Sequence, residues 1–96
     1  FEGVHGDIVP WERFLDSIGE RTRLVMFSTV NYSTGLRPPL EEVAARCRRR
    51  GALLSIDGTQ SLGALPFDVR AIDPDLFAVD GYKWLLCPNG ATFAYI

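Results

Sequence analysis

An aspartate and a lysine, Asp57 and Lys83, are the side chains of this sequence best suited to chemistry. Asp57 directly follows a short apolar segment, and Lys83 comes shortly after Asp80, which ends another. A carboxylate favours the protonated form of a basic nitrogen beside it. An amine in its uncharged form attacks a carbonyl carbon, and burial or nearby positive charge lowers its pKa towards that state. These are the two groups that Schiff-base chemistry next to a ring nitrogen requires.

The elements that must position this pair are those of an α/β fold. Apolar segments without alternation predict strands buried on both faces, over residues 23–30, 52–56 and 76–79. Apolar residues at helical spacing predict helices over residues 10–18, with Asp7 as a possible cap, and 40–50. Strands that alternate with helices predict layers around a mostly parallel sheet.

The last strand, over residues 91–96, is expected to be antiparallel to the strands before it. Its connection from the third strand is short and carries the turn Pro88-Asn89-Gly90, which leaves little room for a helical crossover. Residues 59–62 are expected to form a short turn or helix, and residues 66–75 are expected to be irregular. The missing initial Met and the strand at the other end predict a piece of a longer protein.

Polar residues collect where the three parallel strands are expected to end. They are Ser28, Thr29, Asn31 and Tyr32 after the first strand, Asp57 and Gln60 after the second, and Asp80, Tyr82 and Lys83 after the third. Ligands of open α/β sheets bind beyond the carboxyl ends of the strands, and neighbouring strands lie about 4.8 Å apart. Asp57 and Lys83 could therefore bracket a flat ring. Pyridoxal phosphate needs such a pair, since a lysine binds its aldehyde and a carboxylate faces its pyridine nitrogen.

Composition excludes several classes of protein. The 96 residues are 47% hydrophobic and 23% charged, which is typical of one small globular domain and not of a disordered chain. The net charge of −2 argues against a nucleic-acid partner, and no apolar run is long enough to cross a membrane. Two cysteines are too few for a disulfide framework and, without a signal peptide, favour the cytoplasm.

Four segments resemble the class V aminotransferase family of fold-type I pyridoxal-phosphate enzymes, which includes cysteine desulfurases, kynureninases and isopenicillin N epimerases. Ser-Ile-Asp-Gly-Thr-Gln-Ser at residues 55–61 resembles the family's aspartate segment, and Asp-Gly-Tyr-Lys-Trp at 80–84 resembles its lysine segment. Residues 30–35 and 65–69 resemble two further stretches. The lysine follows the aspartate by 26 positions, a spacing typical of the family.

The resemblance implies a fold, a cofactor and partners. It implies a three-layer α/β/α domain with a mostly parallel sheet and an antiparallel last strand. Residues 1–96 would be the central part of the large, cofactor-binding domain of a longer enzyme, inactive as a fragment. That enzyme would be a homodimer that binds pyridoxal 5′-phosphate and acts on an amino acid. It would bind no metal, nucleic acid or membrane. Aminotransferase, desulfurase, selenocysteine lyase, kynureninase and epimerase chemistry all remain open.

The resemblance also implies roles for single residues. Lys83 matches the Schiff-base lysine, and Asp57 matches the partner of the pyridine nitrogen. Gln60 matches the residue that hydrogen-bonds the phenolic oxygen of the cofactor. Tyr82 stands where kynureninase-like members place a tyrosine at the cofactor phosphate. The segment Val-Asn-Tyr-Ser-Thr-Gly at residues 30–35 favours kynureninase-like members, but these members carry His where this chain has Gln60. These last two features conflict, and the subfamily stays open.

The sequence departs from the family at two positions of the lysine segment. Many members carry Ser or Thr at the position of Asp80 and donate from it to the phosphate; a carboxylate would repel the phosphate, so Asp80 is expected to cap the turn or bond Tyr82. Cys87 replaces a common glycine and is expected to be inert, while Cys47 faces the core. Asn31 and Tyr32 stand where members place a polar group near the ring.

Two other classes of protein are alternatives to an enzyme. A phospho-acceptor signalling domain also places Asp and Lys at the ends of parallel strands, but it needs acidic residues after the first strand to hold magnesium, where this chain has Ser28-Thr29-Val30-Asn31. A non-catalytic α/β interaction module would account for an incomplete site. It would not account for Asp57, Gln60 and Lys83 in register.

Overall fold

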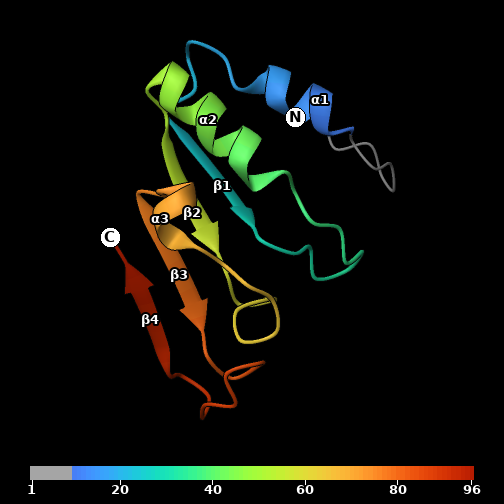
Figure 1. Cartoon of the computed structure of the whole chain (residues 1–96), viewed down its shortest axis with the longest axis vertical. Helices are drawn as coiled ribbons and strands as arrows, with labels where there is room; N and C mark the ends of the chain where they lie inside the picture. Colours follow the sequence, from blue (N-terminus) through green and yellow to red (C-terminus); the bar gives the residue numbers. More distant parts are fainter. Residues whose placement is uncertain (1–9) are drawn as a thin grey trace.

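The structure, a computed structural model, describes residues 10–96 and contains one four-stranded sheet (Figure 1). The strand order follows the chain: β1 (Leu24–Ser28), β2 (Leu53–Asp57), β3 (Leu76–Asp80) and β4 (Thr92–Tyr95). The first three strands are parallel, and β4 is antiparallel to β3. The predicted mixed sheet and the reversed last strand are confirmed, with boundaries within two residues of those expected. The predicted cap Asp7 lies outside the described residues.

Three helices accompany the sheet: α1 (Trp11–Ser17), α2 (Leu40–Arg50) and α3 (Val69–Ile72). Helix α2 ends at Gly51, whose φ of 64° gives the left-handed conformation in which glycine is favoured. Helix α3 contradicts the expectation that residues 66–75 are irregular. It forms because the Asp68 side chain accepts hydrogen bonds from Arg70 N at 2.9 Å and Ala71 N at 3.3 Å, which caps a single turn.

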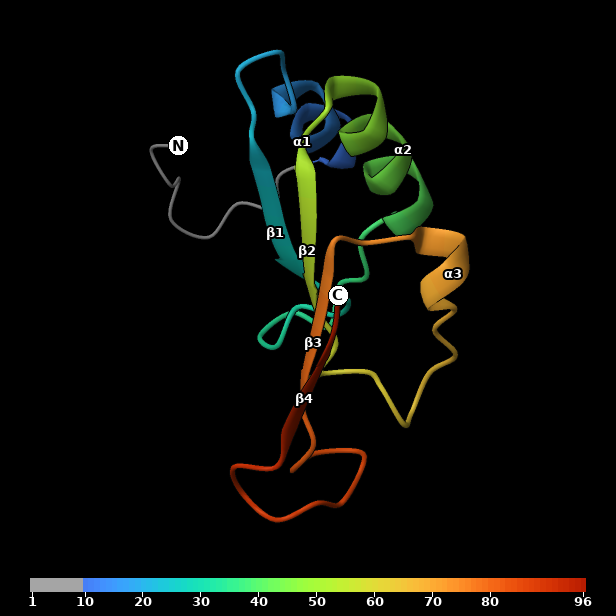
Figure 2. The same ribbon diagram turned by 90° about the vertical axis from the view of Figure 1, so that its left-hand side faces the viewer.

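The core lies between the sheet and the helices, which all cover the same face of the sheet (Figure 2). Val43, Ala44 and Cys47 of α2 are buried against apolar side chains of the first three strands. On the opposite face, Met26 is 67% exposed and Leu53 is 55% exposed. Burial on both faces was predicted for these strands, but residues 10–96 cover only one, because the second helical layer of the expected three-layer fold is not among them.

The arginine run at the end of α2 has a structural role. Arg46 ties α2 to α1, since its guanidinium donates to Asp16 Oδ1 at 2.8 Å and to Leu15 O at 3.1 Å. Arg48 donates to Ile72 O at 3.3 Å and so reaches α3. The positive charges also complement the carboxyl end of the helix dipole.

Among the described helices, none has the length and apolar character needed to cross a bilayer.

A methyl group at Gly58, directly after β2, would meet the core. A Cβ added there would overlap the Phe77 ring and lie 3.0 Å from Val79 Cγ2. We expect Gly58→Ala to lower the free energy of unfolding by about 1–3 kcal/mol through overpacking, measured by denaturant titration. Gly19→Ala is the control, because a Cβ at Gly19 has nothing within 4 Å. Equal losses in the two variants would contradict this packing.

Candidate functional site

The structure gathers the predicted site residues at the carboxyl edge of the sheet. Asp57 is the last residue of β2, and Lys83 lies in the loop that follows the neighbouring parallel strand β3. Gln60 lies in the turn after Asp57, and Tyr82 directly precedes Lys83. In Figure 1 these loops lie together at the lower end of β2 and β3. The register expected from the sequence is therefore present in the fold.

Backbone and side-chain donors hold the Asp57 carboxylate in place. Oδ1 accepts from Thr59 N at 2.8 Å, and Oδ2 accepts a long hydrogen bond of 3.5 Å from Ser28 Oγ. The main-chain oxygen of Asp57 accepts from Thr29 N at 2.9 Å, which fixes the strand end. The residue is nevertheless exposed. Asp57 thus presents an oriented, accessible carboxylate that can accept a proton-bearing nitrogen.

The loop that carries Lys83 is tied to its surroundings at both ends. Asp80 N donates to Thr59 Oγ1 at 3.0 Å, and Gly81 N donates to Ala91 O at 2.9 Å. The indole Nε1 of Trp84 donates to Gln60 O at 2.9 Å. The turn after β2 and the lysine loop are therefore one hydrogen-bonded unit, which holds Gln60 beside the segment of Lys83.

The lysine ammonium lies over an aromatic ring. Lys83 Nζ is 5.4 Å from the centroid of the Tyr82 ring, within the range of a cation–π interaction. Tyr82 itself is 44% exposed. The ion pairs between residues 10 and 96 are Arg46–Asp16 and Arg50–Glu20, so Lys83 has no carboxylate partner in this part of the chain.

Asp80 differs from its expected role. Its carboxylate was expected to cap the turn or to bond Tyr82, but Oδ1 is buried and has no hydrogen-bond partner among the described residues. The backbone, through Asp80 N and Thr59 Oγ1, makes the contact to the turn instead. A buried acceptor without a donor costs about 1–3 kcal/mol, more when it is charged. This carboxylate therefore sits in the site at a cost to stability.

Asn31 closes its own loop. Its side-chain oxygen accepts from the backbone nitrogens of Ser33 and Thr34, both at 3.0 Å, and also from their hydroxyls. Tyr32 is 84% exposed. The Asx turn thus uses the side-chain oxygen of Asn31 to shape the loop.

Sequence reasoning placed Ser28 at the site without a role, and it missed two other supporting residues. Ser28 donates to Asp57. Of the missed residues, Thr59 links the ends of β2 and β3, and Trp84 joins the lysine loop to Gln60. The role of Thr59 was predictable from the sequence, because its hydroxyl comes two residues after an aspartate that ends a strand. The contact of Trp84 spans 24 residues and needs the fold to be seen.

The two cysteines differ in accessibility. Cys47 is 1% exposed, and this burial raises the pKa of its thiol, with the negative charge of Asp75 acting in the same direction. Cys87 is half-buried in the lysine loop. A thiol reacts as the thiolate, so a raised pKa and burial both suppress reaction.

We therefore expect iodoacetamide to modify Cys87 well before Cys47 in the folded protein at neutral pH. Mass spectrometry of the peptides containing each cysteine measures the two rates. Denatured protein is the control, in which both cysteines become accessible and the difference should disappear. Equal rates in the folded protein would contradict the burial of Cys47.

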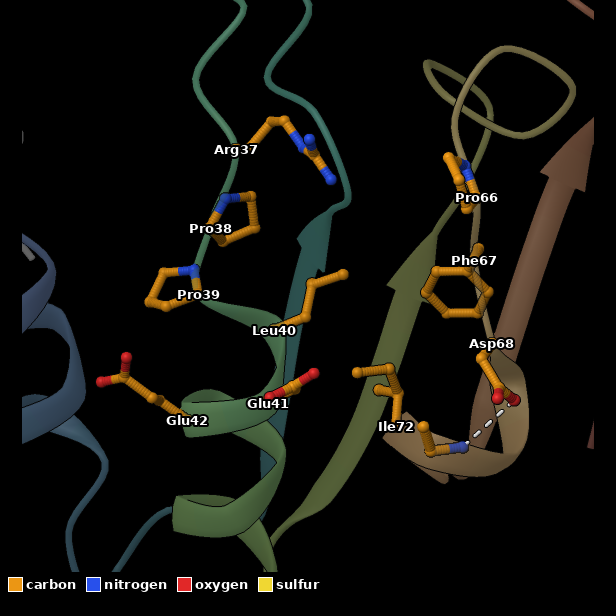
Figure 3. Close-up of a pocket in the computed structure, with 11 residues that line it drawn as sticks. Arg37, Pro38, Pro39, Leu40, Glu41, Glu42, Pro66, Phe67, Asp68 and Ile72 are labelled. Carbon is orange, nitrogen blue, oxygen red and sulfur yellow. Dashed lines mark hydrogen bonds between the residues drawn. The ribbon is translucent and has the colours of Figure 1, made fainter.

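A separate cavity lies on the helical side of the molecule, between the start of α2 and α3 (Figure 3). Its volume is about 340 Å³, and Pro39, Leu40, Phe67 and Asp68 are among its lining residues. It shares no lining residue with the group around Asp57 and Lys83. This cavity is therefore separate from the candidate site at the sheet edge.

The group at the sheet edge fits the ring of pyridoxal phosphate. Asp57 supplies an acceptor for a protonated ring nitrogen, and Lys83 supplies an amine for the aldehyde. The resemblance implies that the phosphate would lie near Asp80, whose carboxylate cannot donate a hydrogen bond to it. Among residues 10–96 there is no cluster of three His, Cys, Asp or Glu residues able to hold a metal ion.

Comparisons with known proteins agree with this arrangement. The family model described as Aminotransferase class-V matches residues 3–96. Isopenicillin N epimerase of Amycolatopsis lactamdurans is 43% identical over 79 residues, which are 82% of this chain and 20% of that protein. A probable cysteine desulfurase of Methanothermobacter thermautotrophicus is 36% identical over 90 residues, 94% of this chain and 22% of the relative. The chain thus spans about a fifth of the length of the curated relatives.

Solved structures share the fold. A cysteine desulfurase of Thermococcus onnurineus NA1, in its apo form, superposes with a TM-score of 0.84 at 25% identity, over 99% of this chain and 24% of that one. The cystine C-S lyase C-DES, solved with its reaction product cysteine persulfide, gives a TM-score of 0.81 at 36% identity, over 90% of this chain and 24% of the other. Residues 10–96 thus share their mixed sheet with these two enzymes.

Proposed function

Because this chain belongs to the class V aminotransferase family, whose members use pyridoxal phosphate, we propose that its protein is an enzyme that binds this cofactor through Lys83 and acts on an amino acid. The observation that carries the proposal is the placement of Asp57 and Lys83. They follow adjacent parallel strands at one edge of the sheet, and the lysine loop is fastened to the turn after Asp57.

Each residue has a defined task in this proposal. Pyridoxal phosphate, when bound, supplies an aldehyde that combines with amines and a ring that withdraws electrons from the substrate. The Asp57 carboxylate, held by Thr59 N, keeps a proton on the ring nitrogen because a negative charge favours the cation. Gln60 donates to the phenolic oxygen and Tyr82 provides a hydroxyl for the phosphate, as the resemblance implies.

Lys83 has two tasks. It anchors the cofactor, and once released from it, its amine takes up or gives back a proton at the substrate carbon. The neighbouring ring of Tyr82 limits the positions of Nζ through the cation–π contact. The lysine loop, tied to Gln60 by Trp84, keeps this amine at the edge where Asp57 orients the ring.

The reaction type within the family is part of the same proposal. The relatives include isopenicillin N epimerases and cysteine desulfurases, so epimerisation and removal of sulfur from an amino acid are the leading candidates. Transamination, selenocysteine lysis and kynurenine cleavage are further candidates, which residues beyond this chain would select. A homodimer and a cytoplasmic location, implied by the resemblance, also belong to the proposal.

The test uses the protein at the length of its relatives. Titration with pyridoxal phosphate should produce a visible absorption band that differs from that of the free cofactor. Addition of L-cysteine, L-alanine or L-kynurenine should then change the band only for compounds related to the substrate. A folded protein that gives no band at saturating pyridoxal phosphate would overturn the proposal.

A further inference from the structure

Among residues 10–96, the polar residues that the fold buries are Thr29 and Ser61, each 4% exposed. Thr29 directly follows β1, and Ser61 lies in the turn after β2. Their hydroxyl oxygens, from residues 32 positions apart in the chain, are 2.6 Å apart and share a hydrogen bond. The two buried polar residues of the described chain therefore bind each other, at the same edge of the sheet as the candidate site.

The directions of these hydrogen bonds follow from the acceptors within reach. Thr29 Oγ1 lies 3.3 Å from the main-chain oxygen of Asp57, which can only accept. The Thr29 hydroxyl therefore donates to Asp57, and the Ser61 hydroxyl donates to Thr29. The opposite direction would leave the Ser61 proton without an acceptor among the described residues, and buried polar groups are rarely left unpaired.

These contacts tie both ends of the turn after β2 to one residue at the end of β1. At the first end, the main-chain oxygen of Asp57 accepts from Thr29 N at 2.9 Å as well as from the hydroxyl. At the other end, the Ser61 side chain binds Thr29, and Ser61 N donates to Gly58 O at 3.0 Å. Between the ends lies Thr59 N, which donates to Asp57 Oδ1 at 2.8 Å. The pair thus fixes the turn that orients this carboxylate.

A buried pair of hydroxyls adds little to stability. Folding exchanges hydrogen bonds to water for hydrogen bonds within the protein, so two apolar groups of the same shape would fill this place almost equally well. A hydrogen bond does fix direction, because the two oxygens must meet within a narrow range of distance and angle. The Thr29–Ser61 pair is therefore better suited to hold the turn in one position than to stabilise the fold.

We propose that Thr29 and Ser61 are a positioning pair, which holds the turn after β2 so that the Asp57 carboxylate meets the ring nitrogen of pyridoxal phosphate. The inference rests on the proposed function of Asp57 and goes beyond it. Both residues are buried, so their hydroxyls act through the main chain of Asp57 and through Thr59 N rather than on a ligand. Removing them should weaken the contact between carboxylate and nitrogen and leave other cofactor contacts in place.

The test compares the wild-type apo-protein, at the length of its relatives, with a double variant, Thr29→Val with Ser61→Ala. This variant removes both hydroxyls and leaves neither without a partner, so its melting temperature should stay close to that of the wild type. Its dissociation constant for pyridoxal phosphate, measured by absorbance titration, should rise about tenfold, because one charge-assisted hydrogen bond is weakened.

A deaza analogue of pyridoxal phosphate, which has carbon in place of the ring nitrogen, separates positioning from a general loosening of the site. The analogue offers Asp57 no N–H donor, so the wild type and the double variant should bind it with equal dissociation constants. A loosened site would instead bind pyridoxal phosphate and the analogue less tightly by the same factor.

Three single substitutions serve as controls. Thr29→Ser keeps the hydroxyl and should bind pyridoxal phosphate as the wild type does. Thr29→Val alone should melt at a lower temperature than the double variant, because it leaves the Ser61 hydroxyl buried without a partner. Thr22→Val makes the same chemical change at a hydroxyl that accepts from Gly19 N, outside the site, and should leave both dissociation constants unchanged.

Ser61→Ala replaces the double variant if the latter does not fold. It keeps the Thr29 hydroxyl bonded to Asp57, so the dissociation constant should rise by a smaller factor, and for pyridoxal phosphate only. An unchanged dissociation constant for pyridoxal phosphate, or an equal rise for it and the analogue, would overturn the positioning role and leave the proposed function standing. A folded wild type that binds no pyridoxal phosphate would instead overturn the proposed function itself.

Discussion

Lys83→Ala should abolish the absorption band of the Schiff base and lower kcat by about 10³-fold or more. Alanine can neither bind the aldehyde nor carry a proton, so both tasks of the lysine are lost together. The cofactor should still bind without a covalent bond, because Asp57 and Gln60 remain. Absorbance of the protein after gel filtration and steady-state kinetics with the identified substrate measure the two effects.

Lys83→Arg is the matched variant for charge. Arginine keeps a cation that can lie over the Tyr82 ring, 5.4 Å from Nζ in the native chain, but it stays protonated and forms no Schiff base. It should therefore be as inactive as the alanine variant and should likewise lack the Schiff-base absorption band. An arginine variant with near-native activity would show that Lys83 acts only through its charge, contrary to the proposed role.

Asp57→Asn should lower kcat by about 10²–10³-fold, the effect of removing one strong electrostatic contact from an active site. Asparagine can keep the hydrogen bond from Thr59 N, 2.8 Å in the native structure, so the turn should survive. It carries no charge, so the ring nitrogen would lose its proton and the ring its electron-withdrawing power. Kinetics and thermal melting of the same protein separate activity from folding.

Two further variants serve as controls for Asp57→Asn. Asp57→Glu keeps the charge and should recover part of the activity, limited by the longer side chain. Asp68→Asn removes the charge of the residue that caps α3, outside the site, and should leave kcat unchanged. An Asp57→Asn enzyme with native kcat would contradict the assignment of this carboxylate to the ring nitrogen.

Much of the fold is predictable from local patterns. The second helix follows from its apolar face and from Gly51, and the structure gives α2 as Leu40–Arg50. The antiparallel β4 follows from a connection too short for a crossover helix. Both features depend on residues near one another in the sequence, which is why they could be read directly.

Features that depend on side-chain capping or on distant segments were not predictable. Helix α3 forms around the Asp68 cap in a stretch whose apolar pattern is too short to indicate a helix. The apolar runs of β1 and β2 predicted burial on both faces, but Met26 and Leu53 are exposed in residues 10–96. An apolar pattern predicts which faces of a strand can be buried. It does not identify the segments of the chain that pack against those faces.

The candidate site also combines features that were predictable from the sequence with features that were not. The sequence predicted that Asp57 and Lys83 follow neighbouring parallel strands, and the parallel pairing of β2 and β3 confirms this placement. The buried oxygen of Asp80 and the contact of Trp84 with Gln60 could not be foreseen, because both depend on how two loops pack together. The expectation that Asp80 bonds Tyr82 was wrong for the same reason.

The most direct measurement is borohydride trapping of the cofactor on the wild-type protein at the length of its relatives. Reduction fixes the Schiff base as a stable secondary amine, and mass spectrometry of the digested protein then identifies the modified residue. The account predicts one pyridoxyl adduct, on Lys83, which disappears when borohydride is omitted. An adduct on a different lysine, with Lys83 unmodified, would contradict the central assignment.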